Sequence, residues 1–478
     1  MFSPAPLKRR CKMIGQVPRQ VVARLDPLLA ALRSPLRPLD SESLAAEIIP
    51  FCDACRFLAR QGTRILKSRK ISLRGRPLWL WGVRSWVHRV PFGRVLIIGT
   101  WNYPLLLPAV QIAQALAAGN QVLLKPAPGC EEASQLIASF FWKVGFTDQE
   151  LRVLPSEPQA AQEAIARGVD LVVLTGSAAT GRRILRTAAE KITPTILELS
   201  GCDAMVVLPG ADLDRVADAI RFGLTLNSGA TCIAPRRILV HHQMALELLA
   251  RIRGRLQGLP PQSIHPAAIK TVCETVDVLL GHDGHAETTG AFDRQLLEDS
   301  GKMHPVVFQL PQIDATATFQ VDVFAPIAIY QTWESLEKLV HSINQSPYAL
   351  GVSIFGPRPS SLDLAQQLAV GNVLINDLIA PTADPRLPFG GRRESGFGVT
   401  RGAEGLLAMT TAKTVTVRRR GTLRHFEPLT PATRDILQGV LRLQFAETVR
   451  DRVAGLRQLI SGVRLSQRKE PPRGGSVP

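Results

Sequence analysis

The sequence predicts an α/β fold whose parallel strands are covered by helices on both faces. Short, wholly apolar runs of strand length alternate along the chain with longer segments of helical periodicity. Strands that are apolar throughout, without alternation, are typical of parallel sheets buried on both faces. The 478 residues, of which 45% are hydrophobic and 20% charged, suffice for two or three domains of ordinary globular composition.

The first strand–helix pattern follows a helical region that extends from Arg19 to about Lys70. Gly119-Asn120 ends the first helix of this pattern. The expected strands are 95–98, 121–124 and 170–174, and the expected helices are 105–118, 131–144 and the segment after Ser177. Ligands of such sheets bind at the carboxyl ends of the strands. We therefore expect a binding site at Thr100-Trp101-Asn102, Lys125 and Gly176-Ser177.

A second α/β pattern begins near Ile196 and continues to about Gly390. Its expected strands are 205–208, 237–240 and 372–376. Residues 411–419 alternate Thr and Val, which favours an exposed or intersubunit strand. An extension begins at Pro428, and we expect its last residues, 470–478, to be disordered.

Charge and cysteine content restrict the class of protein. A net charge of +17 favours anionic partners, but with only 5% aromatic residues a solvated basic surface is favoured over nucleic-acid binding. Seven cysteines indicate reduced thiols and a cytoplasmic setting. Cys52 and Cys55 lie in a helical stretch without a second ligand pair, so we expect packed thiols and no metal site. We find neither a signal peptide nor an apolar run of about 18 residues.

Two residues are candidates for catalysis. Cys232 follows the small-residue turn 227–231, which could direct its thiol into a cleft, although a lone cysteine is more often structural. Glu198 ends the apolar run 195–199, where carboxylates are rare unless they are paired or functional. A desolvated carboxyl has a raised pKa and can act as a general base. The turn 176–181 follows an expected strand and opens a helix, whose free N–H groups favour a pyrophosphate.

Seven segments, in this order, make the chain recognisable: Ile98 to Pro104, Leu124-Lys125-Pro126, Leu174 to Ser177, Leu197 to Gly201, Asn227 to Pro235, Val323 to Pro326, and Leu387 to Gly391. With them the chain resembles the aldehyde dehydrogenase superfamily, and most closely its class 3 and fatty-aldehyde branch. The resemblance extends from about Pro91 to Val417. It implies a Rossmann-like cofactor domain, an α/β catalytic domain and a small oligomerisation strand element. We accordingly expect residues 1–200 to form the N-terminal helices and cofactor domain, 201–395 the catalytic domain, 396–420 the oligomerisation strand and 421–478 the C-terminal extension.

The resemblance also implies roles for single residues. Cys232 would attack the aldehyde to give a thiohemiacetal, and the Asn102 amide and the Cys232 N–H would hold its oxyanion. After hydride transfer to NAD or NADP, Glu198 would activate the water that hydrolyses the thioester. Lys125 would bind the adenosine ribose, Ser177 the pyrophosphate, and Phe324 would pack near the nicotinamide. The remaining cofactor-binding positions are Thr100, Trp101, Gly176, Gly181 and Asp322. Relatives of this branch form homodimers, so we expect one here.

The chain departs from the family pattern at several positions. Ala230 stands where Gln is usual, Cys202 where Lys is usual, and Asp322 where a longer Glu holds the nicotinamide ribose. Pro128 replaces a ribose-binding Glu that would repel a 2′-phosphate, so we expect NADP to be accepted alongside NAD.

The sequence predicts oxidation of a hydrophobic aldehyde, of medium or long chain or aromatic, to its carboxylic acid. Two alternatives remain: an acylating enzyme that passes the thioester to coenzyme A, and a catalytically weak scaffold of the same fold at a membrane. Residues 428–469 predict a basic amphipathic helix that either packs on protein or lies on an anionic membrane.

Overall fold

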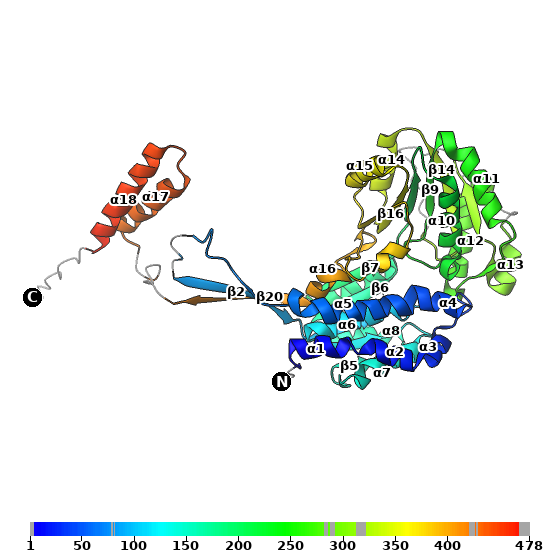
Figure 1. Cartoon of the computed structure of the whole chain (residues 1–478), viewed down its shortest axis with the longest axis horizontal. Coiled ribbons are helices and arrows are strands. Elements are labelled where there is room, and N and C mark those ends of the chain that lie inside the picture. Colours follow the sequence, from blue (N-terminus) through cyan, green and yellow to red (C-terminus); the bar gives the residue numbers. More distant parts are fainter. Residues whose placement is uncertain are drawn as a thin grey trace, which may run out of the picture. The chain divides into compact units, whose positions relative to one another are not determined.

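The computed structural model describes residues 4–77, 80, 82–281, 285–286, 292–311, 322–419, 426 and 429–467. The chain divides into two compact units (Figure 1). The first comprises Met1–Arg69 with Val87–Thr414, and the second comprises Lys70–Trp86 with Val415–Pro478. The four-part division expected from the sequence stays a prediction.

The first unit contains a six-stranded sheet in the order β19-β7-β6-β3-β4-β5. Its strands are β3 (Arg94–Ile98), β4 (Gln121–Lys125), β5 (Leu151–Val153), β6 (Leu171–Gly176), β7 (Thr195–Leu199) and β19 (Gly396–Phe397). All neighbours are parallel except β19, which pairs antiparallel with β7 and places Gly396 opposite Glu198. The wholly apolar runs are therefore parallel strands, as the sequence predicts.

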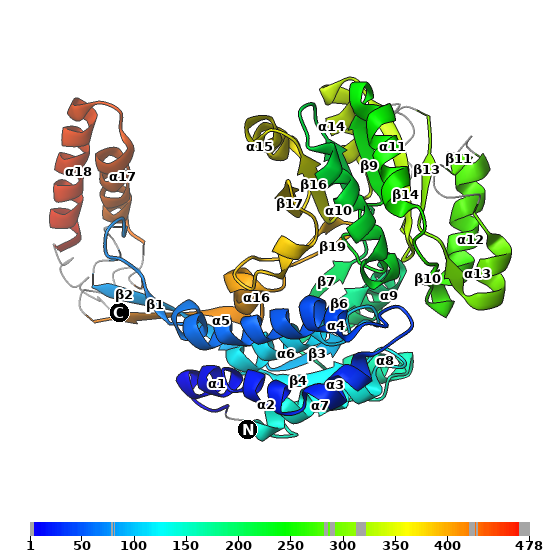
Figure 2. The same ribbon diagram turned by 45° about the vertical axis from the view of Figure 1, so that its right-hand side comes forward.

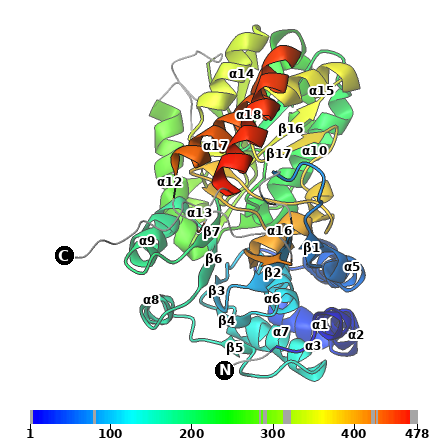
Figure 3. The ribbon, with the colours of Figure 1, turned by 90° about the vertical axis from the view of Figure 1, so that its left-hand side faces the viewer.

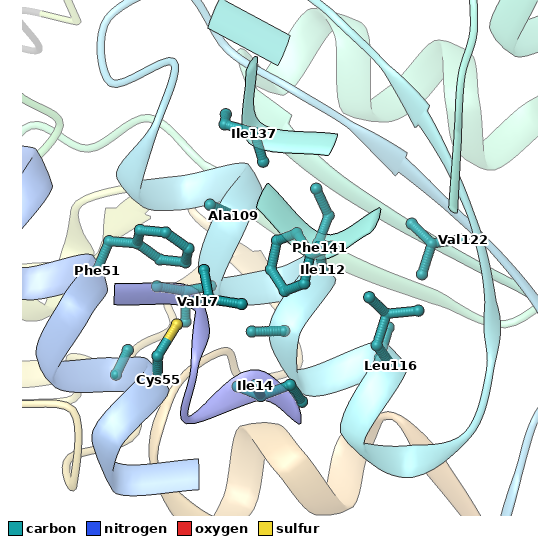
Figure 4. Packing of buried hydrophobic residues seen from close by; sticks show 14 of the residues in the cluster. Ile14, Val17, Phe51, Cys55, Ala109, Ile112, Leu116, Val122, Ile137 and Phe141 are labelled. Atoms are coloured by element: carbon teal, nitrogen blue, oxygen red, sulfur yellow. The ribbon is translucent and has the colours of Figure 1, made fainter. Parts of the chain in front are cut away.

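Alternate residues of these strands enter two separate cores. Val95, Ile97 and Val173 face a core that also contains Phe51 and Phe141. The helices on this face are α1 (Leu7–Ile14), α2 (Val17–Ala23), α3 (Leu25–Leu32), α5 (Ile49–Ile65), α6 (Leu106–Ala118) and α7 (Glu131–Lys143) (Figures 2 and 4). The intervening residues of the strands pack against α8 (Pro158–Ala166) and α9 (Ala178–Ala189). Helices on both faces leave only the strand ends open to a ligand.

A second sheet of the same unit has seven strands in the order β11-β13-β14-β9-β8-β16-β17. They are β8 (Ala204–Val207), β9 (Arg237–His241), β11 (His285–Ala286), β13 (Val306–Gln309), β14 (Ile327–Trp333), β16 (Gly351–Phe355) and β17 (Asn372–Ile375). One face packs against α10 (Leu213–Thr225) and α11 (Ala245–Leu256). The other carries α12 (Pro266–Gly281), α13 (Arg294–Ser300), α14 (Leu336–Gln345) and α15 (Arg358–Gln367). The catalytic segment expected at Cys232 lies between α10 and β9.

Short elements complete the architecture. The remaining strands form three small sheets: β10 (Gln262–Ser263) with β12 (Lys302–Met303), β15 (Tyr348–Ala349) with β18 (Arg392–Arg393), and β1 (Arg69–Lys70), β2 (Val83–Pro91) and β20 (Thr410–Arg418) in that order. The other helical elements are α4 (Asp40–Ser43), a π-helical turn (Leu44–Ile48), the 3-10 turns Leu226–Gly229, His242–Met244 and Ala380–Ala383, and α16 (Gly402–Ala408).

The C-terminal extension is a pair of antiparallel helices, α17 (Pro431–Phe445) and α18 (Val449–Gln467), which lie side by side in Figure 3. The prediction of one amphipathic helix over 428–469 is wrong in this respect. The chain leaves α17 at Ala446 with extended backbone, and Thr448 then caps the next helix through its hydrogen bond from the Asp451 N–H, 3.1 Å long. Gly439 lets the helices meet, because a Cβ there would lie 2.5 Å from the backbone N of Leu459.

Most local predictions are confirmed. The helix expected at 105–118 is α6, and Gly119 ends it in the left-handed conformation with φ 97°. The N-terminal helical region ends at Ile65, before the short strand β1. Residues 470–478, expected to be disordered, lie outside the described residues. Among the helices that the structure describes, none has both the length and the apolar character needed to cross a bilayer.

Candidate active site

A cavity of about 380 Å³ opens at the carboxyl ends of β3, β4, β6 and β7. Parallel pairing brings these strand ends together, so segments far apart in sequence line one space. The predicted site residues that line it are Thr100, Trp101, Asn102, Lys125, Gly176, Ser177, Glu198, Cys232 and Phe324. Two other predicted residues, Gly181 and Asp322, do not line it. The structure therefore gathers both catalytic candidates and most of the predicted cofactor positions in one cavity.

The segment before Cys232 has an unusual backbone. Asn227 and Ser228 have φ of 50° and 53°, and Gly229 has φ of 74°. Such left-handed residues are strained unless they are glycine and persist only where surrounding contacts fix them. A Cβ on Gly229 would lie 2.7 Å from the carbonyl carbon of Ala325, so only glycine fits there. The turn is therefore held tightly in place.

Buried Arg236 supplies much of that support. Its guanidinium donates to the carbonyls of Gly229 at 2.5 Å and Ala325 at 2.6 Å, with longer contacts of 3.4 Å to Ile327 O and 3.5 Å to Thr231 O. Carbonyls buried without a donor would destabilise the fold, and one fully buried side chain satisfies several of them here.

The N-terminal helices fix the other side of the same turn. The Ser228 hydroxyl donates to Leu36 O at 3.1 Å, and the Asn227 N–H donates to the Glu42 carboxylate. Glu47 accepts from the backbone N–H groups of Leu105 at 2.7 Å and Leu106 at 3.0 Å, at the start of α6. The region 36–47 thus orders the segments that carry Asn102 and Cys232.

Cys232 and Glu198 line the cavity together with Asn102, and we call the part that these three residues line its inner end. Glu198 lies close enough to act electrostatically on Cys232. Glu198 is 3% exposed; its Oε2 accepts from the Thr400 hydroxyl at 3.1 Å, and its Oε1 has no partner among the described residues. Burial raises the pKa of Glu198, against the lowering effect of Arg401 and of the Thr400 hydrogen bond. Burial, with Glu198 and Asp203, raises the pKa of Cys232 to about 12, and Arg401 opposes this rise. A carboxyl with a raised pKa and a free oxygen can accept a proton at neutral pH.

Asn102 presents its side-chain amide at the same end. Its Nδ2 donates to Ala230 O at 3.0 Å, and its Oδ1 accepts from the Thr100 hydroxyl at 2.8 Å. Asn227 donates to the backbone carbonyl of Asn102 at 2.8 Å, which links this segment to the cysteine turn. An amide NH₂ has two hydrogens, and the one not bonded to Ala230 can serve an oxyanion. Position 230, where the sequence departs from the family pattern, thus contributes its carbonyl.

Lys125, Ser177 and Arg183 also line the cavity, and the part that they line, which we call its outer end, suits a dinucleotide. Ser177 caps α9 by accepting from the Thr180 N–H at 3.2 Å, which leaves the first N–H groups of the helix for an anion. Burial lowers the pKa of Lys125, which ends β4 on the same side. Arg183 and Thr187 also line this end. The donor set of helix N–H groups and cations therefore fits a pyrophosphate and a ribose.

Gly181 and Asp322, which were expected to bind the cofactor, contact other protein residues instead of lining the cavity. Gly181 lies in α9, where a Cβ would come within 2.8 Å of Leu199 Cδ1, so its absent side chain permits close packing of the helix on β7. Asp322 accepts from the Ser200 hydroxyl at 2.8 Å and from the Tyr348 hydroxyl at 3.1 Å. Burial raises the pKa of Asp322. Both residues lie beside the cavity walls.

Two aromatic side chains, Trp101 and Phe324, line the cavity. Trp101 meets Phe324 edge-on with ring centroids 5.7 Å apart, and stacks on His265 with centroids 4.2 Å apart. A flat apolar group entering between the two ends would contact these rings.

Several residues of the site are not predicted from the sequence. Arg236 and Arg401 are buried cations, and Thr400 donates a hydrogen bond to Glu198 from a position 202 residues further along the chain. Tyr103, whose hydroxyl lies 2.6 Å from that of Thr231, adds a further cross-link. The cluster Thr400-Arg401 follows the recognisable Gly-rich stretch 390–398, which was the one available signal.

The arrangement combines a thiol, an amide donor and a buried carboxyl at one end with anion-binding groups at the other. A thiolate can attack a carbonyl carbon, an amide can hold the resulting oxyanion, and a carboxylate can activate water. This set is suited to acyl chemistry on a carbonyl compound beside a bound dinucleotide.

Comparisons with known proteins agree with this chemistry. Residues 2–415 match the model of the aldehyde dehydrogenase family. The 4,4'-diapolycopene aldehyde oxidase of a Methylomonas species is 32% identical over 414 residues, covering 85% of this chain and 77% of that protein. The 4,4'-diapolycopene-4,4'-dial dehydrogenase of Cytobacillus firmus is 27% identical and covers 85% of this chain and 89% of its own. The structure of a Mycobacterium tuberculosis aldehyde dehydrogenase complexed with NAD+ superposes with a TM-score of 0.78, at 25% identity and 87% coverage of each chain.

Proposed function

Because this chain belongs to the aldehyde dehydrogenase family, and is thereby an oxidoreductase acting on aldehydes, we propose that it oxidises a hydrophobic aldehyde to its carboxylic acid. The substrate we propose is a medium- or long-chain or an aromatic aldehyde. Relatives named for diapolycopene aldehydes support a long, apolar substrate. Membership of the class 3 and fatty-aldehyde branch remains our proposal, since these relatives carry other names.

In the proposed mechanism, Cys232 attacks the aldehyde carbon as its thiolate. The Asn102 amide, fixed by Thr100 and Ala230, holds the oxyanion of the thiohemiacetal together with the Cys232 N–H. The chemistry that NAD or NADP supplies when bound is acceptance of the hydride from this carbon. Glu198 then takes a proton from the water that hydrolyses the thioester and frees the cysteine.

The observation that carries this proposal is that Cys232, Glu198 and Asn102 all line one cavity. The free Oε1 of Glu198 favours hydrolysis over transfer of the acyl group to coenzyme A, because hydrolysis is the step that needs a base.

The test follows the absorbance of reduced nucleotide with a panel of aliphatic and aromatic aldehydes. We expect turnover with the wild type and none with Cys232→Ala, whereas Cys273→Ala, which changes a buried thiol remote from the cavity lining, should remain active. No turnover of any aldehyde with either nucleotide would contradict the proposal. Formation of an acyl-CoA on adding coenzyme A would replace it by the acylating alternative.

We propose that the enzyme accepts NADP as well as NAD. Pro128 carries no charge that would repel a 2′-phosphate, and Arg183 lines the same part of the cavity as Lys125. Steady-state kinetics with both nucleotides test the acceptance of NADP, and strict specificity for NAD would overturn it.

We also propose that Thr100, Trp101, Ser177 and Phe324 bind the nucleotide, and that the protein is cytoplasmic.

We propose a homodimer formed in part through β20. This strand lies at the edge of its sheet, and most of its residues are exposed. An exposed strand edge offers unpaired backbone groups to a second chain. Light scattering coupled to size exclusion should give twice the 52.1 kDa chain mass, and a monomer at micromolar concentration would contradict this.

The helical pair α17–α18 supports peripheral contact with an anionic membrane. Leu437, Leu441 and Phe445, at helical spacing on α17, are 54%, 57% and 74% exposed. On α18 an exposed apolar row runs beside exposed arginines. The apolar row is Val449, Val453, Leu456 and Ile460, and the arginines are Arg450, Arg457 and Arg464. An apolar row flanked by cations is typical of interfacial helices.

Co-sedimentation with phosphatidylserine vesicles tests this contact. The full chain should sediment with them, and a truncation after Glu427 should not. Leu441→Glu/Phe445→Glu should weaken binding as well. Equal partitioning of the full chain and the truncation would remove the case for the helices as a membrane contact.

A further inference from the structure

Arg401 is a buried cation beside the catalytic pair. Its side chain is 9% exposed, and it directly follows Thr400, which holds Glu198 by a hydrogen bond of 3.1 Å. Its backbone has φ 60° and ψ 177°, a region that essentially only glycine adopts. A non-glycine residue keeps such a conformation only where its surroundings over-determine it. The backbone N–H of Arg401 is indeed held by Gln114 Oε1, at 3.3 Å.

The guanidinium is fixed against the wall of the site. It lies over the Phe389 ring, 4.7 Å from the ring centroid, and its Nη1 donates to Thr382 O at 2.6 Å. Phe389 belongs to a small apolar cluster that Cys232 packs against. Arg401 and Cys232 therefore both pack against the cluster that contains Phe389, and the charge of Arg401 acts on the thiol electrostatically.

The two buried arginines near the site differ in what they bind. The guanidinium of Arg236 donates hydrogen bonds to main-chain carbonyls of the cysteine turn and of the start of β14. Arg401 makes one side-chain hydrogen bond within the described residues, and no carboxylate lies within ion-pair distance of it there. Arg401 is therefore a buried cation without an ion pair among the described residues, and its charge acts on Cys232 and Glu198.

The charged and titratable groups around Cys232 pull in opposite directions. Burial is the largest cause of the raised pKa of Cys232, and the carboxylates add to it, whereas Arg401 lowers it. Arg401 likewise lowers the pKa of Glu198. The groups that interact with Cys232 are Glu198 on β7, Asp203 before β8, Arg236 before β9, Tyr103 before α6 and Arg401 before α16.

We propose that Arg401 is a positioning residue whose charge keeps Cys232 and Glu198 able to ionise inside a buried site. This inference rests on the proposed roles of those two residues. Without the guanidinium, the enclosed thiolate would face two carboxylates and an aromatic ring, and a charge without a partner is strongly disfavoured in such surroundings. Both the attack on the aldehyde and the activation of water require the ionised forms.

The test measures the pH dependence of Cys232 alkylation by iodoacetamide, followed on the Cys232 peptide by mass spectrometry, in the full chain without substrate. Arg401→Gln keeps a donor for Thr382 O but removes the charge, and Arg401→Lys keeps the charge. We expect Arg401→Gln to be alkylated about tenfold more slowly at pH 7.5, with its profile moved to higher pH. Arg401→Lys should restore most of the wild-type profile.

Arg386→Gln is the matched control, because it removes an exposed guanidinium from the neighbouring surface and should leave the profile unchanged. If Arg401→Gln and Arg401→Lys gave the same profile, the hydrogen bond and not the charge would be the function of the residue, and the proposal would be overturned. A wild-type profile in a folded Arg401→Gln would overturn it equally. If Arg401→Gln does not fold, Arg401→Met replaces it as the uncharged variant. The proposal then requires a profile moved to higher pH in Arg401→Met and a profile close to wild type in Arg401→Lys.

Failure of this inference is distinguishable from failure of the proposed function. Alkylation reports the state of the thiol without aldehyde or nucleotide. An inactive enzyme whose thiol responds to Arg401 would contradict only the proposed reaction, whereas an active enzyme whose thiol does not would contradict only the role of Arg401.

Discussion

The two ends of the cavity are built in different ways. At the inner end, Glu198 and Asn102 are almost fully buried, and their partners Thr400 and Ala230 lie more than a hundred residues away in sequence. At the outer end, Ser177 bonds Thr180 three residues on, and Arg183 is exposed in the same helix. The proposed phosphate site is thus formed by a local strand-to-helix turn, whereas the proposed reacting groups depend on long-range packing. Substitutions at the inner end should therefore cost far more.

The largest contrast between the two ends is expected from removing a carboxylate at each. Glu198→Gln should slow thioester hydrolysis by about 10²- to 10⁴-fold, because a positioned general base contributes that much. Hydrolysis needs ionised Glu198, whose pKa is raised by burial. The wild-type rate should therefore increase with pH through that raised pKa, and this increase should vanish in Glu198→Gln. Stopped-flow kinetics between about pH 5 and pH 9 measure both the rate of hydrolysis and its pH dependence.

Glu157→Gln is the control for that experiment. Glu157 is exposed at the start of α8 and acts on Lys125 at the outer end. Replacing it should change the rate of hydrolysis by less than about twofold, as for most surface changes, and should leave the pH dependence of that rate unchanged. A comparable loss in both variants would remove the distinction between the two ends.

The oxyanion donor should have the next largest effect. Asn102→Ala removes the amide from the inner end and should lower kcat by about 10²- to 10³-fold. Asn102→Asp, which has the same size but offers no N–H, should fall by a similar factor. Nucleotide binding, measured by fluorescence titration, should be retained in both. An Asn102→Asp variant with near wild-type kcat would show that the amide is not an oxyanion donor.

The contribution of Arg236 to the structure of the inner end should appear as a change in the free energy of unfolding. Arg236→Met leaves the buried carbonyls of Gly229 and Ala325 without these donors, and we expect the free energy of unfolding to fall by about 3 kcal/mol. Urea denaturation measures this change in the free energy of unfolding. Arg186→Gln, an exposed change on α9, should stay within about 0.5 kcal/mol of wild type. Equal stability of Arg236→Met and wild type would mean that water replaces the guanidinium without cost.

The smallest effect is expected at the outer end. Arg183→Gln should raise KM for NADP by up to about fivefold and leave KM for NAD nearly unchanged, since an exposed charge pair contributes about 1 kcal/mol or less. Arg186→Gln lies one helical turn further on, outside the cavity lining, and should change neither value. A parallel rise of KM for both nucleotides in Arg183→Gln would place the residue away from the 2′-phosphate.

The difference between the two ends also explains what the sequence could predict. Strand ends such as Lys125 and Gly176-Ser177 follow from apolar runs and turns, so these residues were found without long-range information. Asp322 and Gly181 were assigned by resemblance, and their hydrogen bonds and packing depend on Ser200, Tyr348 and Leu199. Thr400 and Arg401 reach Glu198 only through tertiary packing, which no local pattern encodes. The break between α17 and α18 was missed because apolar spacing continues across it.

The central claim is that Cys232 carries the acyl group and Glu198 releases it. The most direct test is the intact mass of Glu198→Gln after mixing with nucleotide and an aliphatic aldehyde. We expect a burst of one reduced nucleotide per chain and an acyl adduct that maps to Cys232, absent from the Cys232→Ala/Glu198→Gln double variant. Turnover without any adduct on Cys232, or an adduct that persists in the double variant, would contradict it.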